Sequence, residues 1–232
     1  MISVIMTSYL GDYPGARRNP EQKFIRAVNS FINQTIGQQN CELVIVSDGC
    51  EITNRLFEEH YQRVSNISLI KMPKEKNSEY PGGYRQIGID NSKYEYITYL
   101  DSDDFILPSR LKDAYTSIAN SKEIIIIDEI YNMPNVQQAV ARVVKEGKGE
   151  MLSKFNQFEI EFIKLRVNWT GGTYQLIHKK DIGVTWKSEG GRGEDYVFAN
   201  EIYKKYKIKP SEKRRHVGGY VICHHPIFKF DV

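Results

Sequence analysis

The 232-residue sequence has no long hydrophobic run. No apolar segment approaches the ~18 residues that a membrane-spanning helix needs. Residues 1–6 contain neither a basic region nor a small-residue cleavage site, so no secretory signal is expected. These absences argue against an integral membrane protein and against a secreted one, and we expect a cytoplasmic protein.

The sequence also has few cysteines and prolines, and its positive and negative charges nearly balance. The three cysteines, Cys41, Cys50 and Cys223, have no metal-ligand spacing and are expected to be reduced thiols. The 17 glycines and 8 prolines follow no period, which excludes a fibrous protein. The net charge of +3 is too small to indicate nucleic acid as a partner.

The composition that remains is that of an ordinary globular protein, with 41% hydrophobic and 26% charged residues. A chain of this length fits one α/β domain. Because no linker rich in Pro, Gly or Ser separates the two halves, residues 1–232 are predicted to form a single domain.

In the first half, short apolar runs rich in β-branched residues alternate with segments of helical period. The predicted strands are 2–6, 42–47, 67–72, 95–100 and 123–131. The predicted helices are 20–35, 56–64, 84–91 and 111–119. This alternation indicates a mainly parallel central sheet with helices on both faces. The second half is less regular, with predicted strands 172–178 and 219–223, a helix over 193–206 and partly helical character over 139–162.

Polar residues follow three predicted strands, as Thr7-Ser8-Tyr9, Ser47-Asp48-Gly49 and Asp101-Ser102-Asp103. In parallel sheets, ligands bind beyond the carboxyl ends of the strands, so we expect the site there. On an extended backbone Asp101 and Asp103 point the same way, and two such carboxylates can bind Mg²⁺ or Mn²⁺ and bridge a diphosphate. The alternative is a strand-end turn in which Asp101 caps the helix near Pro108.

The order and spacing of these motifs resemble glycosyltransferase family 2. The matching stretches are 4–9, 27–35, 42–49, 83–88, 96–104, 107–108 and 193–195. The resemblance covers residues 1–110 well and 165–205 loosely. It implies a GT-A type, Rossmann-like sandwich, with a donor-binding half in 1–110 and an acceptor-binding half in 111–232.

The same resemblance implies an inverting, metal-dependent glycosyltransferase. Its donor would be a nucleotide-sugar, with UDP favoured, and its cofactor Mn²⁺ or Mg²⁺. The acceptor would be a hydroxyl of a glycan or of a lipid-linked sugar. We also allow for a homo-oligomer.

The resemblance assigns the nucleotide-sugar site to Thr7, Ser8, Tyr9, Asp48, Arg85, Asp101, Ser102 and Trp169. Asp48 would accept a hydrogen bond from a base N–H, Arg85 would approach the diphosphate or the base, and Asp103 would bind the metal. Alternatively, Thr7 and Ser8 only cap the strand end, Arg85 lies on the surface, and Trp169 packs in the core.

The sequence departs from the family pattern in three places. Ser47 stands where a second acidic residue is usual, and Cys50 replaces the usual Ser or Thr. The loop over residues 10–21 is longer than usual. The geometry of base recognition by Asp48 is therefore in question.

Asp195 is the predicted general base, with Glu194 as the second candidate. Both residues open a predicted helix, where the macrodipole favours the ionised carboxylate. Alternatively, both acids only decorate the first helical turn. In the histidine pair 224–225, the resemblance implies that His225 completes the metal site, and imidazole suits Mn²⁺ better than Mg²⁺. The alternative is a solvated pair.

Residues 204–215 hold seven basic side chains against Glu212 alone. This segment would lie on anionic lipid headgroups, giving peripheral contact with the inner membrane face, or it is a solvated surface.

Two other functions stay open. A sugar-nucleotide nucleotidyltransferase is also an α/β enzyme, but its early Gly-rich loop is only faintly echoed by Gly11, Gly15, Arg17 and Lys23. An inactive carbohydrate-binding module would bind donor or glycan without turnover. A dinucleotide dehydrogenase is disfavoured, because no G-x-G-x-x-G follows a predicted strand.

Overall fold

The computed structural model describes residues 1–12, 19–73, 81–128, 163–164, 176–187, 194–209, 213–215 and 217–223. The helices are α1 (Pro20–Ile32), η1 (a 3-10 helix, Gln38–Asn40), α2 (Glu51–His60), α3 (Gly82–Asp90), α4 (Arg110–Ser121) and α8 (Glu194–Tyr206). The strands are β1 (Ile2–Ser8), β2 (Cys41–Asp48), β3 (Ile67–Met72), β4 (Tyr96–Tyr99), β5 (Phe105–Ile106), β6 (Ile125–Asp128), β7 (Ile163–Lys164), β8 (Leu176–Lys179), β9 (Arg214–Arg215) and β10 (Tyr220–Cys223).

The main sheet has seven strands in the order β3-β2-β1-β4-β8-β6-β9. Strands β3, β2, β1 and β4 are parallel, as predicted. Strand β8 lies antiparallel between β4 and β6, although it comes much later in the chain. A central sheet that is parallel in its first half and mixed beyond β4 therefore organises the molecule.

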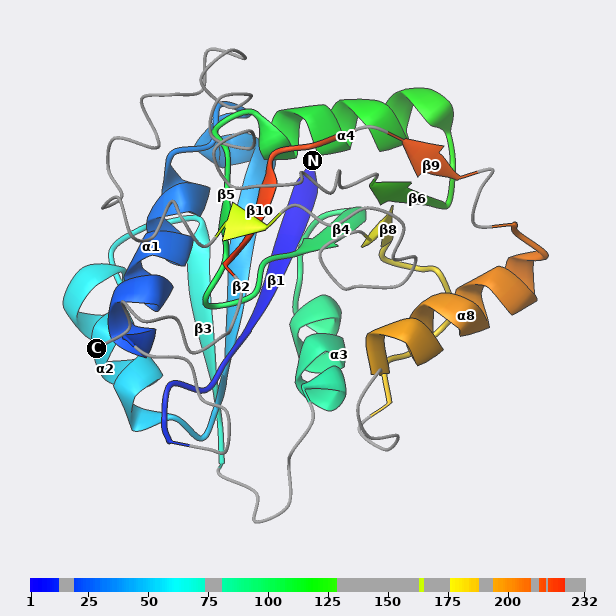
Figure 1. Ribbon diagram of the computed structural model, residues 1–232. Coiled ribbons are helices and arrows are strands. Elements are labelled where there is room, and N and C mark those ends of the chain that lie inside the picture. Colours follow the sequence, from blue (N-terminus) through cyan, green and yellow to red (C-terminus); the bar gives the residue numbers. More distant parts are fainter. Residues whose placement is uncertain are drawn as a thin grey trace.

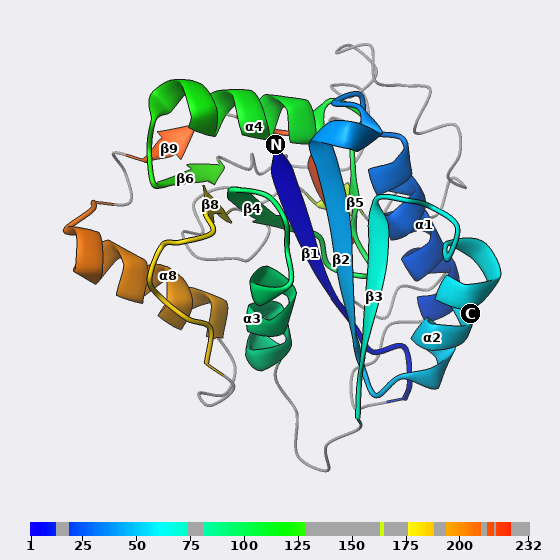
Figure 2. The same ribbon diagram turned by 180° about the vertical axis from the view of Figure 1, so that it is seen from behind.

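Helices cover both faces of this sheet because alternate strand residues point to opposite sides. Val4 and Met6 of β1 pack with α1, α2 and α4 on one face. Ile5 of β1 and Tyr99 of β4 pack with α3 and α8 on the other. Figures 1 and 2 show the two groups of helices on opposite sides of the strands. The predicted α/β sandwich is confirmed.

The helix boundaries differ from the predictions at both ends, and α1 ends at Ile32 rather than residue 35. Helix α2 begins at Glu51 rather than residue 56 and ends at His60 rather than residue 64. Helix α3 begins at Gly82, two residues before the predicted start at residue 84. The first turns carry few apolar side chains, so hydrophobic period alone places these starts too late. The partly helical segment predicted over 139–162 lies outside the described residues.

A second sheet of three short antiparallel strands has the order β5-β10-β7. Tyr220 of β10 pairs with Ile106 of β5, and Cys223 pairs with Ile163 of β7. The late strand predicted over 219–223 is thus confirmed, and it lies beside the segment that directly follows the acidic turn at 101–104. Among the helices that the structure describes, none has the length and apolarity of a membrane span.

A buried ion pair anchors the chain that leads into β10. The Arg110 guanidinium on α4 donates to the Asp128 carboxylate at the end of β6, and side-chain exposure is 1% and 0%. The same carboxylate accepts the backbone N–H groups of Val217 and Gly218, each at 3.0 Å. Arg110 also donates to the Gly218 carbonyl at 2.9 Å. One ionic group therefore joins α4, β6 and the segment before β10.

We expect Asp128→Ala to lower the free energy of unfolding by about 3–5 kcal/mol, because Arg110 keeps its charge in a buried site without its carboxylate. Urea denaturation measures the loss. The matched control is Glu58→Ala, which breaks the exposed Lys71–Glu58 pair at 2.5 Å and should cost less than about 1 kcal/mol. Equal losses in the two variants would contradict the structural role assigned to Asp128.

Candidate active site

The predicted site residues gather where the parallel strands end. Ser8 at the end of β1 is in register with Ser47 of β2, and the Leu100 N–H, just after β4, donates to the Ile5 carbonyl at 3.1 Å. Figure 1 shows β1, β2 and β3 running from the edge marked N to the opposite edge of the sheet. Asp48 and Asp101 therefore follow strands that end at one edge, as the sequence predicts.

At the end of β1, Ser8 is buried and its hydroxyl forms a 2.8 Å hydrogen bond with Thr53 on α2. This contact favours the strand-end role for Ser8, whereas Thr7 and Tyr9 beside it are half-buried. The sulfur of Cys50 accepts the Leu10 N–H at 3.2 Å. The cysteine that departs from the family pattern thus supplies an acceptor that ties the first loop to α2.

Residues 101–104 form a tight acidic turn after β4. The Asp104 N–H donates to the Asp101 carbonyl at 3.1 Å, and Arg26 of α1 donates to the Asp103 carbonyl at 2.5 Å. The side chain of Asp101 is 36% exposed, whereas Asp104 is buried. The Tyr220 hydroxyl donates to the Asp104 carboxylate at 3.1 Å. The extended backbone expected for this motif is wrong, because β4 ends at Tyr99 and residues 102–103 lie in a turn, so strand alternation does not align Asp101 with Asp103. They are the two acids of this turn that are not fully buried.

Arg85 lies between the acidic turn and the start of α8. Its side chain is only 10% exposed, so the surface interpretation of Arg85 is wrong. One guanidinium nitrogen lies 2.5 Å from Glu194 and the other lies 3.7 Å from Asp101. The guanidinium also lies over the Trp186 ring, 5.0 Å from its centroid. Arg85 therefore connects the acidic turn at 101–104 with Glu194 at the start of α8.

Glu194 begins α8, which confirms the helix start predicted at the acidic pair. Its carboxylate accepts from Arg85 with one oxygen and from the Gly82 N–H, at 3.1 Å, with the other. Burial raises the pKa of Glu194, and these two donors oppose the rise. Asp195 is half-buried, and one of its carboxylate oxygens accepts the Tyr196 N–H at 2.8 Å.

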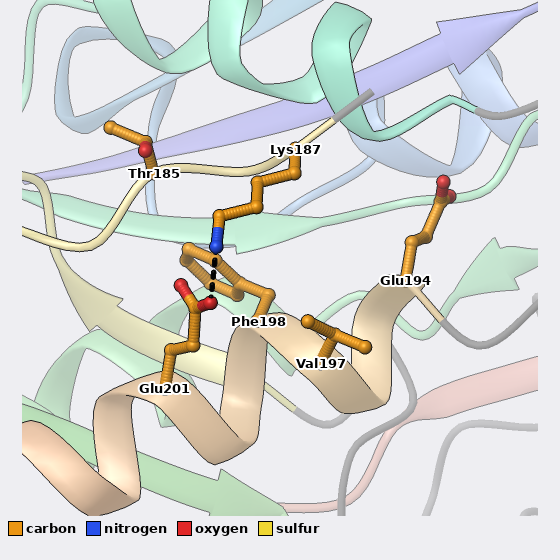
Figure 3. Close-up of a pocket in the computed structure, with 6 residues that line it drawn as sticks. All are labelled: Thr185, Lys187, Glu194, Val197, Phe198 and Glu201. Atoms are coloured by element: carbon orange, nitrogen blue, oxygen red, sulfur yellow. Dashed lines mark hydrogen bonds and ion pairs between the residues drawn. The ribbon is translucent and has the colours of Figure 1, made fainter. Parts of the chain in front are cut away.

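A small hollow beside Glu194 is lined by Thr185, Lys187, Glu194, Val197, Phe198 and Glu201. In Figure 3, Lys187 and Glu201 form an ion pair, at 2.6 Å, while the Glu194 carboxylate points away from them. Helix α3 approaches the 184–187 segment so closely that a Cβ at Gly82 would lie 2.4 Å from the Lys187 carbonyl oxygen. Glycine is required there, and its N–H is thereby brought to Glu194.

Trp186, which lies against the Arg85 guanidinium, belongs to a buried aromatic and polar network with Phe198, Tyr99 and His178. Trp186 stacks on Phe198 with ring centroids 4.2 Å apart, and its Nε1–H donates to the Tyr99 hydroxyl at 2.9 Å. His178 Nδ1 lies 2.7 Å from the Lys179 carbonyl, so it carries the proton, and Nε2 accepts from Tyr99 at 2.7 Å. Burial lowers the pKa of His178 to about 4, which keeps the imidazole neutral. Every polar group of the network has a partner.

The acidic turn carries side chains of the type that a hard divalent cation binds. Mg²⁺ is commonly bound by one or two carboxylates together with substrate phosphates and water, and Asp101 and Asp103 supply two carboxylates. Asp104 is engaged by Tyr220 instead. Within the described ranges, no three His, Cys, Asp or Glu side chains form a metal cluster. The further ligand predicted from the sequence, His225, lies outside those ranges, as do His224 and Trp169.

The basic segment 204–215 is described except for residues 210–212. Lys205 donates to the Gly183 carbonyl at 2.6 Å, and Lys213 forms an ion pair with Glu123 at 2.6 Å. Lys204, Lys207 and Lys209 are exposed. Lipid contact through this segment stays a prediction.

Sequence reasoning missed Tyr220 and Gly82 as parts of the site. Tyr220 lies 119 residues beyond Asp101, and nothing in its local pattern indicates a contact with the acidic turn. Gly82 directly precedes the 83–88 motif, and only the close approach of residue 187 explains why it is glycine.

Comparison with known proteins finds a family and several relatives for this chain. The family described as "Glycosyl transferase family 2" matches residues 3–180. The poly(ribitol-phosphate) β-N-acetylglucosaminyltransferase TarP of Staphylococcus aureus is 24% identical over 216 residues, covering 90% of this chain and 60% of TarP. This chain spans less than two thirds of the length of such curated relatives.

Two solved structures share the fold. Staphylococcus aureus TarS in complex with UDP-GlcNAc has a TM-score of 0.60 at 20% identity, over 87% of this chain and 53% of that one. The mannosyltransferase PcManGT of Pyrobaculum calidifontis, in complex with GDP-Man and Mn²⁺, has a TM-score of 0.54 at 13% identity, over 87% and 51%. The fold is therefore of the GT-A type.

Proposed function

Because the chain belongs to glycosyl transferase family 2, we propose that it transfers a sugar from a nucleotide-diphospho-sugar, with inversion, to an acceptor hydroxyl. The observation that carries the proposal is the position of Arg85, between Asp101 of the acidic turn and Glu194 of the acidic pair. A buried guanidinium there lies between the side chains assigned to the donor and the side chains assigned to the acceptor.

Arg85 supplies positive charge at the edge where a diphosphate would leave. Charge that develops on the leaving group is stabilised best by donors that are already oriented, and the Glu194 contact and the Trp186 ring hold the guanidinium in place. A divalent cation held by Asp103 and Asp101 would add Lewis-acid stabilisation of the same diphosphate. We propose Mn²⁺ or Mg²⁺ as the cofactor because carboxylate oxygens are the ligands that these cations prefer.

Asp195 is the better candidate for the general base. Both oxygens of Glu194 are engaged, by Arg85 and by the Gly82 N–H. A carboxylate engaged in this way orients its partners and is poorly placed to take a proton from a sugar hydroxyl. Asp195 lies one residue further along the first turn of α8, where the helix dipole favours its ionised form.

The donor and acceptor are proposed from the relatives. TarS binds UDP-GlcNAc, and TarP is named for transfer to poly(ribitol-phosphate). We therefore propose a UDP-sugar donor and a glycan or polyol-phosphate polymer of the teichoic acid kind as acceptor. A cytoplasmic location, peripheral contact with the inner membrane face and a homo-oligomer stay predictions.

A panel of nucleotides tests this proposal. UDP, GDP and dTDP are each added to the chain with and without Mn²⁺, and thermal unfolding is followed. UDP with Mn²⁺ should give the largest rise in melting temperature, and the matching UDP-sugar should be turned over when a polyol-phosphate acceptor is present. Release of pyrophosphate from a nucleoside triphosphate would instead indicate the nucleotidyltransferase alternative.

We expect Asp48→Ala to weaken UDP binding by ~1–3 kcal/mol, because the hydrogen bond that the uracil N–H would donate to Asp48 is lost. Isothermal titration measures the affinity for UDP and for GDP. The control is Asp181→Ala, an exposed aspartate on the turn after β8, which should bind UDP normally. If the unaltered chain binds UDP, GDP and dTDP equally, the role of Asp48 in base selection is wrong.

A further inference from the structure

Strand β10 places one tyrosine against the acidic turn. The Tyr220 hydroxyl accepts the Asp101 N–H at 3.0 Å and donates to the Asp104 carboxylate at 3.1 Å. It thus spans the turn from its first residue to its last, with Ser102 and Asp103 between them. The side chain of Tyr220 is 2% exposed, so water cannot easily replace these bonds.

Other contacts hold other parts of the acidic turn. Arg26 holds the Asp103 carbonyl, the backbone bond joins residues 101 and 104, and Arg85 lies 3.7 Å from the Asp101 carboxylate. Asp104 is buried, and a buried carboxylate needs hydrogen-bond donors. Tyr220 supplies one such donor to the Asp104 carboxylate. Burial, with Coulombic interaction with Asp104 and Asp101 added, raises the pKa of Tyr220 well above its ordinary value, so the hydroxyl stays protonated.

Several contacts fix Tyr220 itself. Strand β10 pairs with β5, which begins directly after Asp104, and the Leu107 N–H donates to the Gly219 carbonyl at 2.7 Å. Gly219 has a φ of +79°, and a Cβ there would lie 3.3 Å from the Arg110 Cβ. The Arg110–Asp128 ion pair then holds the two preceding residues. The hydroxyl therefore reaches the turn from a rigid support.

We propose that Tyr220 is a positioning residue for the metal and diphosphate site, holding the Asp101–Asp104 turn so that the carboxylates of Asp101 and Asp103 face the donor. This inference rests on the proposed function. Partners that orient metal-ligating groups typically contribute 10–100-fold to metal affinity. The contribution of Tyr220 should therefore appear in metal-dependent nucleotide binding and not only in stability.

Tyr220→Phe keeps the ring and removes the hydroxyl. In a titration with UDP, the Mn²⁺ concentration for half-maximal binding should rise at least ~10-fold, while the weak binding of UDP without metal should not change. The matched control is Tyr61→Phe. Tyr61 is also buried, and its hydroxyl lies 3.3 Å from the Ile25 carbonyl and from Asn29, away from the acidic turn. This variant should lose stability without any shift in Mn²⁺ dependence.

Asp104 provides a second test in which Tyr220 stays in place. Asp104→Asn and Asp104→Ala both remove the charge, but only asparagine keeps an oxygen that accepts from the Tyr220 hydroxyl. Asp104→Ala should shift the Mn²⁺ dependence about as far as Tyr220→Phe, and Asp104→Asn should shift it less. Equal shifts in the two Asp104 variants would overturn the proposal.

Measurements on the unaltered chain distinguish a failure of the proposed metal-dependent function from a failure of the role of Tyr220. If its UDP binding does not depend on Mn²⁺, the metal-dependent function and the role of Tyr220 both fail. If the dependence is present and Tyr220→Phe retains it in full, only the role of Tyr220 is refuted.

Discussion

Asp103→Asn should abolish Mn²⁺-dependent binding of UDP and lower turnover by at least ~10²-fold, because a metal bound to the diphosphate contributes several kcal/mol to the transition state. Asparagine has nearly the same size as aspartate but lacks the charge that a hard cation needs. Isothermal titration with UDP and Mn²⁺, followed by a turnover assay, measures both losses.

The structure makes this variant informative, because the Asp103 backbone is held independently of its carboxylate. Arg26 bonds to the Asp103 carbonyl, and the neighbouring turn is closed by the bond between residues 101 and 104. The melting temperature should therefore change little. Asp113→Asn, on α4 and outside the residues assigned to the site, is the control and should bind UDP normally. Unchanged metal dependence and turnover in Asp103→Asn would remove Asp103 from the site.

Asp195→Asn should lower turnover by at least ~10²-fold with little change in donor affinity, because a general base acts on the acceptor and not on the nucleotide. The amide keeps the shape and hydrogen bonding of the carboxylate but cannot take the proton. Steady-state kinetics gives the fall in turnover, and NMR of the product gives the anomeric configuration, which should be inverted relative to the donor.

Glu194→Gln is the comparison that separates the two acids of the pair. Because Glu194 holds Arg85 and the start of α3, its replacement should weaken donor binding as well as turnover. If Glu194→Gln loses turnover with donor affinity intact, and Asp195→Asn is nearly as active as the unaltered chain, then Glu194 and not Asp195 is the general base. A product of retained configuration would reject direct displacement altogether.

The sequence predicts the fold of residues 1–110 well because their strands are nearly continuous apolar runs. The parallel order of β1, β2 and β4 places Asp48 and Asp101 at one edge, and that follows from the alternation of strands and helices alone. Strand β8 is different, since no local pattern predicts that it inserts antiparallel between β4 and β6.

The contacts that arrange the site span long distances in the chain and are therefore hidden from local patterns. Arg85 on a short helix has the local pattern of a surface residue, and only the arrival of Glu194, 109 residues later, buries it. Arg110 and Asp128 likewise have no local signal, because their pairing depends on how α4 packs beside β6. Charged residues become buried only where such partners meet.

An experimental structure of the chain with UDP and Mn²⁺ would decide the position and role of the site. We expect uracil beside Asp48, the cation on the carboxylates of Asp103 and Asp101, and the diphosphate within reach of Arg85 at the carboxyl edge of β1, β2 and β4. Asp195 should face the open side of the donor site. A nucleotide bound elsewhere on the chain, or one bound at this edge with Asp103 and Arg85 uninvolved, would contradict it.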